Sequence, residues 1–306
     1  MRTNLFVAGA LLALLHGAWP QSGEAQILDS QRRVAGPGQT QFQIDFLQPF
    51  GGPVIPSFEG WYRNPDGSYE LSFGYFNVNT EEVIEIPLGE NNFIEPSEFD
   101  GVQPTHFMPM PENDRRYYGV FTVRVPPDFG DGDVVWTLRI NGREFSVPGR
   151  ITKPLYEVNA FEFPGRITSA PLVKLSESGS VARGPAGNFE TQVTARVGEP
   201  IPLPVWVNRV EEFAHEPTSL VVNWFKHQGP GAVSFDVEQS VVSPEEFSPT
   251  GQWATRTAQA TFTEAGRYIV RVLVHNTPLE WADEDETVFE YHCCWSNAFV
   301  TIDVEP

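Results

Sequence analysis

The chain has 306 residues, with 27 prolines, 26 glycines, only two cysteines and a formal net charge of −20. Such an acidic chain repels the phosphates of nucleic acids and of anionic lipids, so neither is an expected partner. Two cysteines cannot build a disulfide framework, so packing must hold the cores together. The length favours two domains.

The first 25 residues have the pattern of a secretory signal peptide. Arg2 precedes an apolar run, 5–15, and Gly23-Glu24-Ala25 fits a small-x-small cleavage site. A spanning helix needs about 20 apolar residues, which makes a retained N-terminal anchor the weaker alternative. We therefore expect a protein secreted to the periplasm or the cell exterior, with no membrane span in the mature chain.

Alternating apolar and polar residues predict short strands through an N-terminal domain, residues 26–150. The predicted strands are 40–47, 57–64, 68–77, 81–86, 115–125, 133–140 and 143–147. Pro65-Asp66-Gly67 predicts a hairpin turn, and Asn141-Gly142 predicts a type I′ hairpin. Gly119 interrupts its strand and indicates a bulge. Strands of this number and length indicate an antiparallel β-sandwich.

A proline-containing linker, 151–168, leads to a second domain, 169–306. The strands predicted in the second domain are 170–175, 191–197, 203–207, 219–227, 232–238, 254–262, 263–275 and 298–304. The predicted fold class is therefore all-β, with two antiparallel β-sandwich domains of immunoglobulin-like type after the signal peptide.

Three segments of the second domain carry a resemblance to a known family. They are LVVNWFKHQGPGAVSF (220–235), ATFTEAGRYIVRVLV (260–274) and AFVTIDV (298–304). Together they look like a PKD-like domain of immunoglobulin fold. Such domains resemble extracellular spacers, adhesion modules and binding modules, which are seldom catalytic. The stretch 276–297 departs from the family because it is much longer than a usual hairpin loop, and the N-terminal half resembles no family.

This long stretch contains the adjacent cysteines Cys293 and Cys294. Paired thiols in an oxidising compartment are expected to form a disulfide, and here it would be a vicinal one. Free or structural thiols and an intermolecular bridge are alternatives, since strand geometry aims neighbouring side chains at opposite faces. A metal site that joins the cysteines to His275 and His292 is the last alternative.

The same stretch is the best candidate recognition surface, because binding residues concentrate on loops held by rigid scaffolds. Its candidate recognition residues are Trp281, Asp283, Glu284, Asp285, Glu286, His292 and Trp295. Its carboxylates, like Asp128, Asp131 and Asp133 in the first domain, could supply oxygen ligands to Ca²⁺. Solvated turn carboxylates are the favoured interpretation, so no cofactor is expected, with Ca²⁺ as the alternative.

The hairpin 60–76 is rich in aromatic residues. On an exposed sheet face, Trp61 and Tyr62 could stack on sugar rings, whereas burial in the core is the favoured interpretation. Because the two are neighbours on a strand, one of them is expected to face outward.

Catalytic motifs are missing from the sequence. It contains no Gly-x-Ser-x-Gly elbow, no His-Glu-x-x-His and no phosphate-binding loop. We therefore expect a non-enzyme, a secreted binding, adhesion or structural module that recognises a protein or glycan at a cell surface. One alternative is a carbohydrate- or small-ligand-binding protein that uses the aromatic hairpin. Another is a secreted hydrolase with a carboxylate pair, which leaves no sequence signature.

Overall fold

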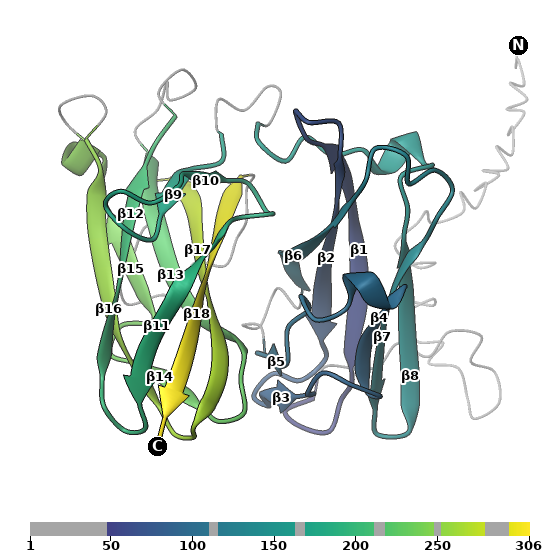
Figure 1. Cartoon of the computed structure of the whole chain (residues 1–306), viewed down its shortest axis with the longest axis horizontal. Coiled ribbons are helices and arrows are strands. Elements are labelled where there is room, and N and C mark those ends of the chain that lie inside the picture. Colours follow the sequence, from purple (N-terminus) through teal and green to yellow (C-terminus); the bar gives the residue numbers. More distant parts are fainter. Residues whose placement is uncertain (1–47, 110–115, 163–168, 211–217, 248–251, 279–293) are drawn as a thin grey trace, which may run out of the picture. The chain divides into compact units, whose positions relative to one another are not determined.

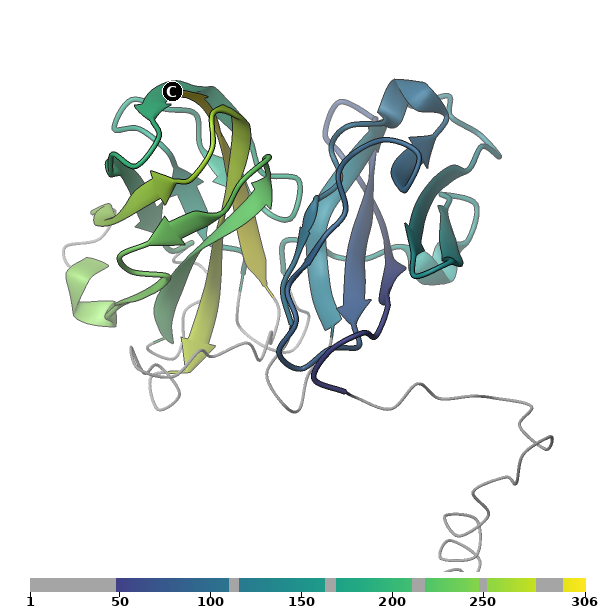
Figure 2. The same cartoon turned by 90° about the horizontal axis from the view of Figure 1, so that it is seen from below.

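The computed structural model describes residues 48–109, 116–162, 169–210, 218–247, 252–278 and 294–306, and these belong to one compact unit. Within the described residues, regular structure is almost entirely β-strand, and most strands pair antiparallel (Figures 1 and 2). No helix in these ranges is long and apolar enough to cross a membrane. The predicted all-β class is confirmed.

The N-terminal half, residues 48–162, contains two three-stranded antiparallel sheets. The first has the order β1-β2-β6, formed by β1 (Val54–Arg63), β2 (Tyr69–Asn77) and β6 (Arg116–Val125). The second has the order β4-β7-β8, formed by β4 (Asn92–Glu95), β7 (Val134–Ile140) and β8 (Arg143–Gly149). The remaining elements are the paired strands β3 (Ile84–Glu85) and β5 (His106–Phe107) and the 3-10 helices η1 (Ser97–Phe99) and η2 (Pro154–Tyr156).

Aromatic side chains fill the core between these two sheets. Phe73 on β2 stacks on Phe121 of β6, with ring centroids 5.4 Å apart, and both meet the edge or face of Trp136 on β7. The β7–β8 hairpin turns at Asn141 and Gly142, whose φ angles of 51° and 72° are the two positive values of a type I′ turn. The predicted type I′ hairpin is therefore confirmed.

The C-terminal half, residues 169–306, contains two five-stranded sheets. One has the order β10-β9-β12-β16-β14, formed by β9 (Leu172–Lys174), β10 (Ala182–Arg183), β12 (Ile201–Asn208), β14 (Val233–Phe235) and β16 (Ala254–Phe262). The other has the order β11-β18-β17-β13-β15, formed by β11 (Phe189–Arg196), β13 (Thr218–Gln228), β15 (Gln239–Val242), β17 (Gly266–Pro278) and β18 (Trp295–Glu305), with the 3-10 helix η4 (Pro244–Phe247) after β15. The β11–β18 pair is parallel.

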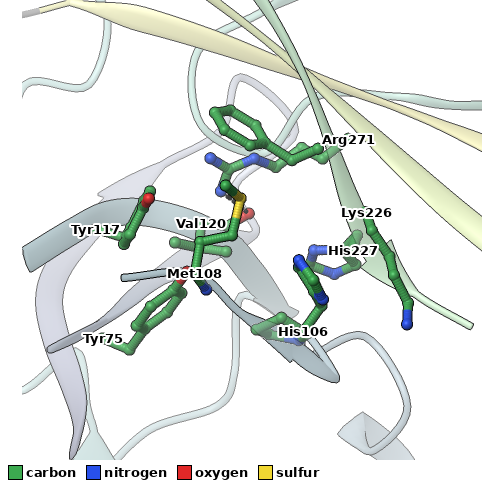
Figure 3. Close-up of a pocket in the computed structure, with 10 residues that line it drawn as sticks. Tyr75, His106, Met108, Tyr117, Val120, Lys226, His227 and Arg271 are labelled. Carbon is green, nitrogen blue, oxygen red and sulfur yellow. Dashed lines mark hydrogen bonds between the residues drawn. The ribbon is translucent and has the colours of Figure 1, made fainter. Parts of the chain in front are cut away.

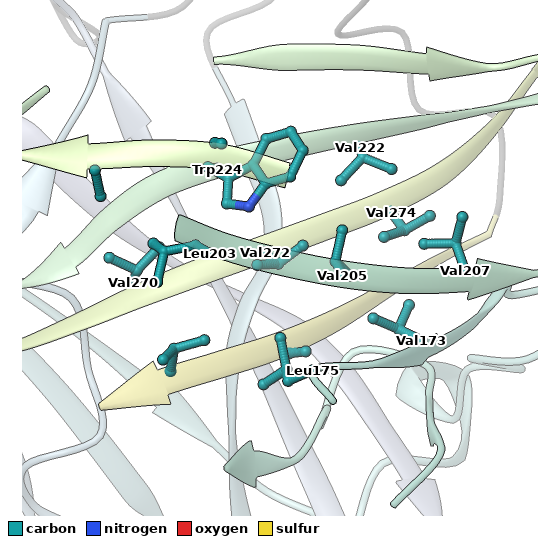
Figure 4. Close-up of a cluster of buried hydrophobic side chains, with 14 of the residues drawn as sticks. Val173, Leu175, Leu203, Val205, Val207, Val222, Trp224, Val270, Val272 and Val274 are labelled. Atoms are coloured by element: carbon teal, nitrogen blue, oxygen red, sulfur yellow. The ribbon is translucent and has the colours of Figure 1, made fainter. Parts of the chain in front are cut away.

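Period-two patterning builds the core between these sheets (Figure 4). Trp224 is buried among valines and leucines that alternate along three strands, β12, β13 and β17. Those labelled in Figure 4 are Leu203, Val205, Val207, Val222, Val270, Val272 and Val274. Trp224, with 1% of its surface exposed, is therefore a core residue of this half.

The predicted and observed strands differ mainly where the strands are short. Four strands, β4, β5, β10 and β15, were not predicted, because they have two to four residues each and leave no clear alternation. The predicted strands 81–86 and 232–238 are reduced to β3 and β14. The predicted strand 40–47 lies outside the described residues. The proposed signal peptide, linker and domain boundaries stay predictions.

Candidate functional site

A small pocket lies where the end of β13 meets β5, β6 and the chain before β5 (Figure 3). Its lining includes Tyr75, His106, Tyr117, Lys226, His227 and Arg271, and none of its ten lining residues is Asp or Glu. Its volume of about 20 Å³ is room for about one water molecule. The pocket is therefore too small for an organic substrate, and its titratable groups must be understood through their protein contacts.

Lys226 is held in an ion-pair network between the two halves. Its Nζ lies 2.8 Å from Oε1 of Glu85 on β3, and Nδ1 of His106 on β5 lies 2.6 Å from the same oxygen. Only 3% of the Lys226 side chain is exposed, against 45% for Glu85. Burial opposes ionisation of Glu85, but hydrogen bonds from His106 and Lys226 outweigh it and hold the pKa of the carboxyl below its usual value.

His227 is fixed by the chain segment 101–107 of the N-terminal half. Its Nε2 lies 2.9 Å from the Val102 carbonyl oxygen, and its own carbonyl accepts a 2.8 Å hydrogen bond from the Thr105 amide. Burial lowers the pKa of His227 to about 3, with the nearby Arg271 and His106 charges adding to the effect. A group of that pKa is a poor general base near neutral pH.

Next to His227, the Gln228 amide Nε2 donates to the carbonyls of Gly101 and Gln103 at 2.9 and 2.7 Å. His227 and Gln228, at the end of β13, therefore both bind the segment 101–107. This segment has little regular structure of its own, and the hydrogen bonds from β13 satisfy its backbone carbonyls.

A second set of contacts centres on Gly119 of β6. Its carbonyl accepts hydrogen bonds from Nδ2 of Asn297 at 2.8 Å and from Nε1 of Trp295 at 3.4 Å, both on β18. Nearby, Nη1 of Arg271 donates to the Val120 carbonyl at 3.2 Å, and its guanidinium lies 5.1 Å from the Phe225 ring centroid. The β2–β6 register shifts at this point, which confirms the predicted bulge.

Trp61 and Tyr62 are both buried, with exposed fractions of 8% and 4%. The indole of Trp61 donates to the Lys153 carbonyl at 3.2 Å. The phenol oxygen of Tyr62 accepts from the Ala186 amide at 3.2 Å, and its ring meets the edge of Phe161 at 5.4 Å. The expectation that one of the two faces outward is wrong, because residues from the C-terminal half and from beyond β8 cover the second face of the strand.

Buried carboxylates are paired with arginines. Glu70, which is buried, accepts from Nε of Arg124 at 2.8 Å and from Oγ1 of Thr122 at 2.6 Å. Glu59 forms an ion pair with Arg116. These carboxylates lie on the β1-β2-β6 sheet rather than in the pocket lining, so the pocket offers no carboxylate pair for glycoside hydrolysis.

The described residues contain no group of three or more His, Cys, Asp or Glu side chains arranged to hold a metal ion. His275 is buried, with Nδ1 3.3 Å from the Asn276 carbonyl oxygen, and burial lowers its pKa to about 4. Asp133 forms an ion pair with Arg150 at 2.7 Å, whereas Asp128 and Asp131 are exposed. The three aspartates therefore form no such group, whereas the metal site predicted for His275 involves His292 and Cys293, which lie outside the described residues.

Cys294 is buried and takes part in a disulfide. Cys293 lies outside the described residues, so the vicinal ring stays a prediction. The predicted recognition residues that also lie outside are Trp281, Asp283, Glu284, Asp285, Glu286 and His292. Trp295 is described, and its indole is packed against Gly119 instead of pointing away from the protein.

Three residues of this site, Lys226, His227 and Arg271, were not predicted from the sequence. A signal was present, because the chain has only three lysines and one of them lies in a strand that otherwise reads as core. Polar residues at the end of such a strand indicate a second packed surface. Contacts between residues more than 100 positions apart decide which segment packs on this surface.

No family model matches the chain, and no curated protein matches it. Solved structures with some likeness include WR4, a C. elegans MSP family member, at 8% identity and a TM-score of 0.25, covering 39% of this chain and 91% of that one. PapD-like domain 7 of human CEP192 matches at 9% identity and a TM-score of 0.27, covering 51% of this chain and 98% of that one. CfaE, the adhesive subunit of the CFA/I fimbria of enterotoxigenic Escherichia coli, matches at 9% identity and a TM-score of 0.26. This match covers 84% of this chain and 81% of that one. Identities and TM-scores at this level establish no family and carry no function to this chain.

Proposed function

We propose that the chain is a secreted, non-catalytic binding or adhesion module in which two β-sandwiches act as one structural body. The observation that supports this most directly is how the titratable groups of the pocket are used. Lys226 and His227 both bind groups of the N-terminal half, and the space beside them is about the size of one water molecule. A hydrolytic site needs a free acid or base next to room for a substrate.

The partner that we propose is a protein or a glycan at a cell surface, recognised by loops at the ends of the sandwiches. The signal-peptide pattern of residues 1–25 supports action outside the cytoplasm. The resemblance of the C-terminal half, residues 169–306, to PKD-like domains supports a spacer or adhesion role. The charge of −20 disfavours polyanionic partners.

The two alternatives receive less support. Stacking of a sugar on the hairpin 60–76 would need an exposed aromatic face, and Trp61 and Tyr62 are both buried. Hydrolysis by a carboxylate pair would need two carboxylates in one cleft, and the described pocket is lined by none.

Binding is tested with the mature chain, residues 26–306, labelled with a fluorophore. We expect saturable binding to particular members of a glycan array, a protein array or a panel of intact cells, and competition by excess unlabelled chain. Binding that never saturates, or that survives the competitor, on every surface would overturn the binding role.

Secretion is tested separately by expressing residues 1–306 and residues 26–306 in the same host. We expect only the longer chain to reach the periplasm or medium, shortened at its N-terminus. If both remain in the cytoplasm, the secretory interpretation is wrong, whatever the result of the binding assay.

A further inference from the structure

His227 joins the two halves through both its ring and its backbone. The ring binds the Val102 carbonyl and the His227 carbonyl binds the Thr105 amide, at 2.9 and 2.8 Å. A carbonyl oxygen only accepts hydrogen bonds, so Nε2 of His227 carries the proton and Nδ1 is the nitrogen left to be protonated. A proton on Nδ1 leaves the bond to Val102 in place, so its cost to the closed junction comes from burying the added charge.

A proton on Nδ1 would add a positive charge among others. The charged or titratable groups that line the pocket around this ring are Lys226 from the same strand, His106 from β5, Arg271 from β17, Tyr75 from β2 and Tyr117 from β6. The carboxylate of Glu85 binds two of these groups, Lys226 and His106. On its remaining side the imidazole meets Phe299 of β18, with ring centroids 5.1 Å apart. No Asp or Glu is among the described residues that line the pocket, and the His227 ring is shielded from bulk water, so burial of the imidazolium is costly.

We propose that His227 makes the junction between the two halves acid-sensitive. Protonation of its ring favours an open state in which the ring reaches water and the hydrogen bonds to residues 101–107 break. The Glu85 network opposes opening because its carboxylate stays ionised in mild acid and continues to hold Lys226. The junction therefore loosens first around His227, while the two hydrophobic cores stay folded.

The direction of the pH effect follows from linkage. The closed state lowers the pKa of His227 from 6.5 to about 3, so the open state binds one proton more between these values. The ratio of open to closed molecules then rises as pH falls below 6.5, approaching tenfold for each pH unit. Above pH 6.5 this contribution is absent, and the junction is fully closed with respect to His227.

Amide hydrogen exchange measures this opening directly. The Thr105 amide is protected by the His227 carbonyl and reports on the junction, whereas the amides of 268–274 in β17 report on the core of the C-terminal half. After correction for the intrinsic pH dependence of exchange, we expect the protection of Thr105 to fall from pH 6.5 to about pH 4.5, approaching tenfold per unit. Protection in 268–274, which reports global unfolding of the C-terminal half, should stay well above the protection of Thr105 throughout that range.

Two variants separate His227 from other acid effects. His227→Gln keeps an amide that can donate to the Val102 carbonyl but cannot titrate, so its Thr105 protection should be independent of pH. His275→Gln removes the other buried histidine, which has no hydrogen bond to 101–107 in the described residues, and should keep the wild-type pH dependence. Circular dichroism confirms that each variant is folded.

The pH dependence of Thr105 protection in the wild-type protein tests the proposal even if His227→Gln does not fold. Constant Thr105 protection between neutral pH and about pH 4.5 would overturn the proposal, since one bound proton predicts a steep change. Equal protection of Thr105 and of 268–274 across this range would overturn it too, because both would then exchange only through unfolding of the whole protein. A folded His227→Gln protein with unchanged pH dependence would show that another group is the sensor.

Discussion

Gly119 shows at the scale of a residue why the β6 bulge exists. Its φ of +47° is in the left-handed region, and a Cβ built there would lie 2.4 Å from Cζ2 of Trp295. The missing side chain thus lets the indole approach the backbone closely enough to reach the Gly119 carbonyl. A feature that the sequence marks only as an interrupted strand is the contact point for β18.

Gly119→Ala is expected to destabilise the protein by about 1–3 kcal/mol, because the new methyl group overlaps Trp295 and forces a backbone or side-chain shift. Urea unfolding at neutral pH measures the loss. Gly142→Ala is the matched control, since its φ of +72° is similar but no atom lies within 4 Å of the added Cβ. Equal losses for the two variants would show that backbone strain alone matters and that the Trp295 contact does not.

At the scale of an element, β13 contributes residues both to the core of the C-terminal half and to the contact with the N-terminal half. Trp224 lies in the core of the C-terminal half, whereas Lys226, His227 and Gln228 at the end of the strand bind the N-terminal half. A β-bulge between Lys226 and Gln228 marks the change, and it aims successive side chains away from the regular alternation. The strand can therefore bury an ammonium group without placing it in a hydrophobic core.

The Lys226–Glu85 pair should respond unequally to removal of its two partners. Glu85→Ala leaves the buried ammonium of Lys226 without its carboxylate and should cost about 2–3 kcal/mol. Lys226→Met removes the buried charge itself, and Glu85, which is partly exposed, stays hydrated and bound to His106, so the loss should be smaller. Urea unfolding of both variants tests the order. Lys174→Met is the control, since the contacts of Lys174 with described residues are to Glu177 and Trp253 of its own half. A larger loss for Lys226→Met than for Glu85→Ala would contradict this account.

At the scale of the whole molecule, two separate hydrophobic cores are joined by a polar junction. One core draws on residues 54–138 and the other on residues 173–304. Between them lie hydrogen bonds and an ion pair from Lys226, His227, Asn297 and Gln228 to the N-terminal half. Polar contacts of this kind fix orientation while each core keeps its own packing.

Global stability should fall in mild acid. Burial lowers the pKa of His227 to about 3 and of His275 to about 4, both from 6.5, so the unfolded chain binds more protons as pH drops below 6.5. For each histidine, the free energy of unfolding falls by about 1.4 kcal/mol per unit of pKa shift. The fall is complete only below the pKa of that histidine in the folded protein. The carboxyl of Glu85 has a lowered pKa, so its contribution is also lost, but only below its unfolded value of 4.5. Thermal unfolding from pH 7 to about pH 4 should show a steady fall in Tm, and an unchanged Tm would contradict the neutral buried histidines.

Cleavage of the chain between residues 162 and 169 should leave two folded pieces, because each half has its own core. At neutral pH the pieces should stay associated through the junction. A protease site placed in 163–168, followed by size-exclusion chromatography and circular dichroism of each piece, tests this. If either isolated piece is unfolded, its core depends on the other half and the two-domain prediction is wrong.

The amino-acid sequence by itself determined the longer strands and, in each, a set of alternating core residues. Alternation in β2, β13 and β17 and the Asn141-Gly142 turn are local signals, and each was observed where it was predicted. Such signals work because side-chain direction in a strand repeats every two residues and a type I′ turn needs positive φ angles.

Only the tertiary structure decided what the polar residues do. Lys226 meets Glu85 across 141 positions, and Asn297 meets Gly119 across 178. Trp61 and Tyr62 are both buried because distant segments cover the face that a lone hairpin would expose. No local pattern records which segment closes over a strand, since long-range pairing depends on the shape and polarity of two assembled surfaces.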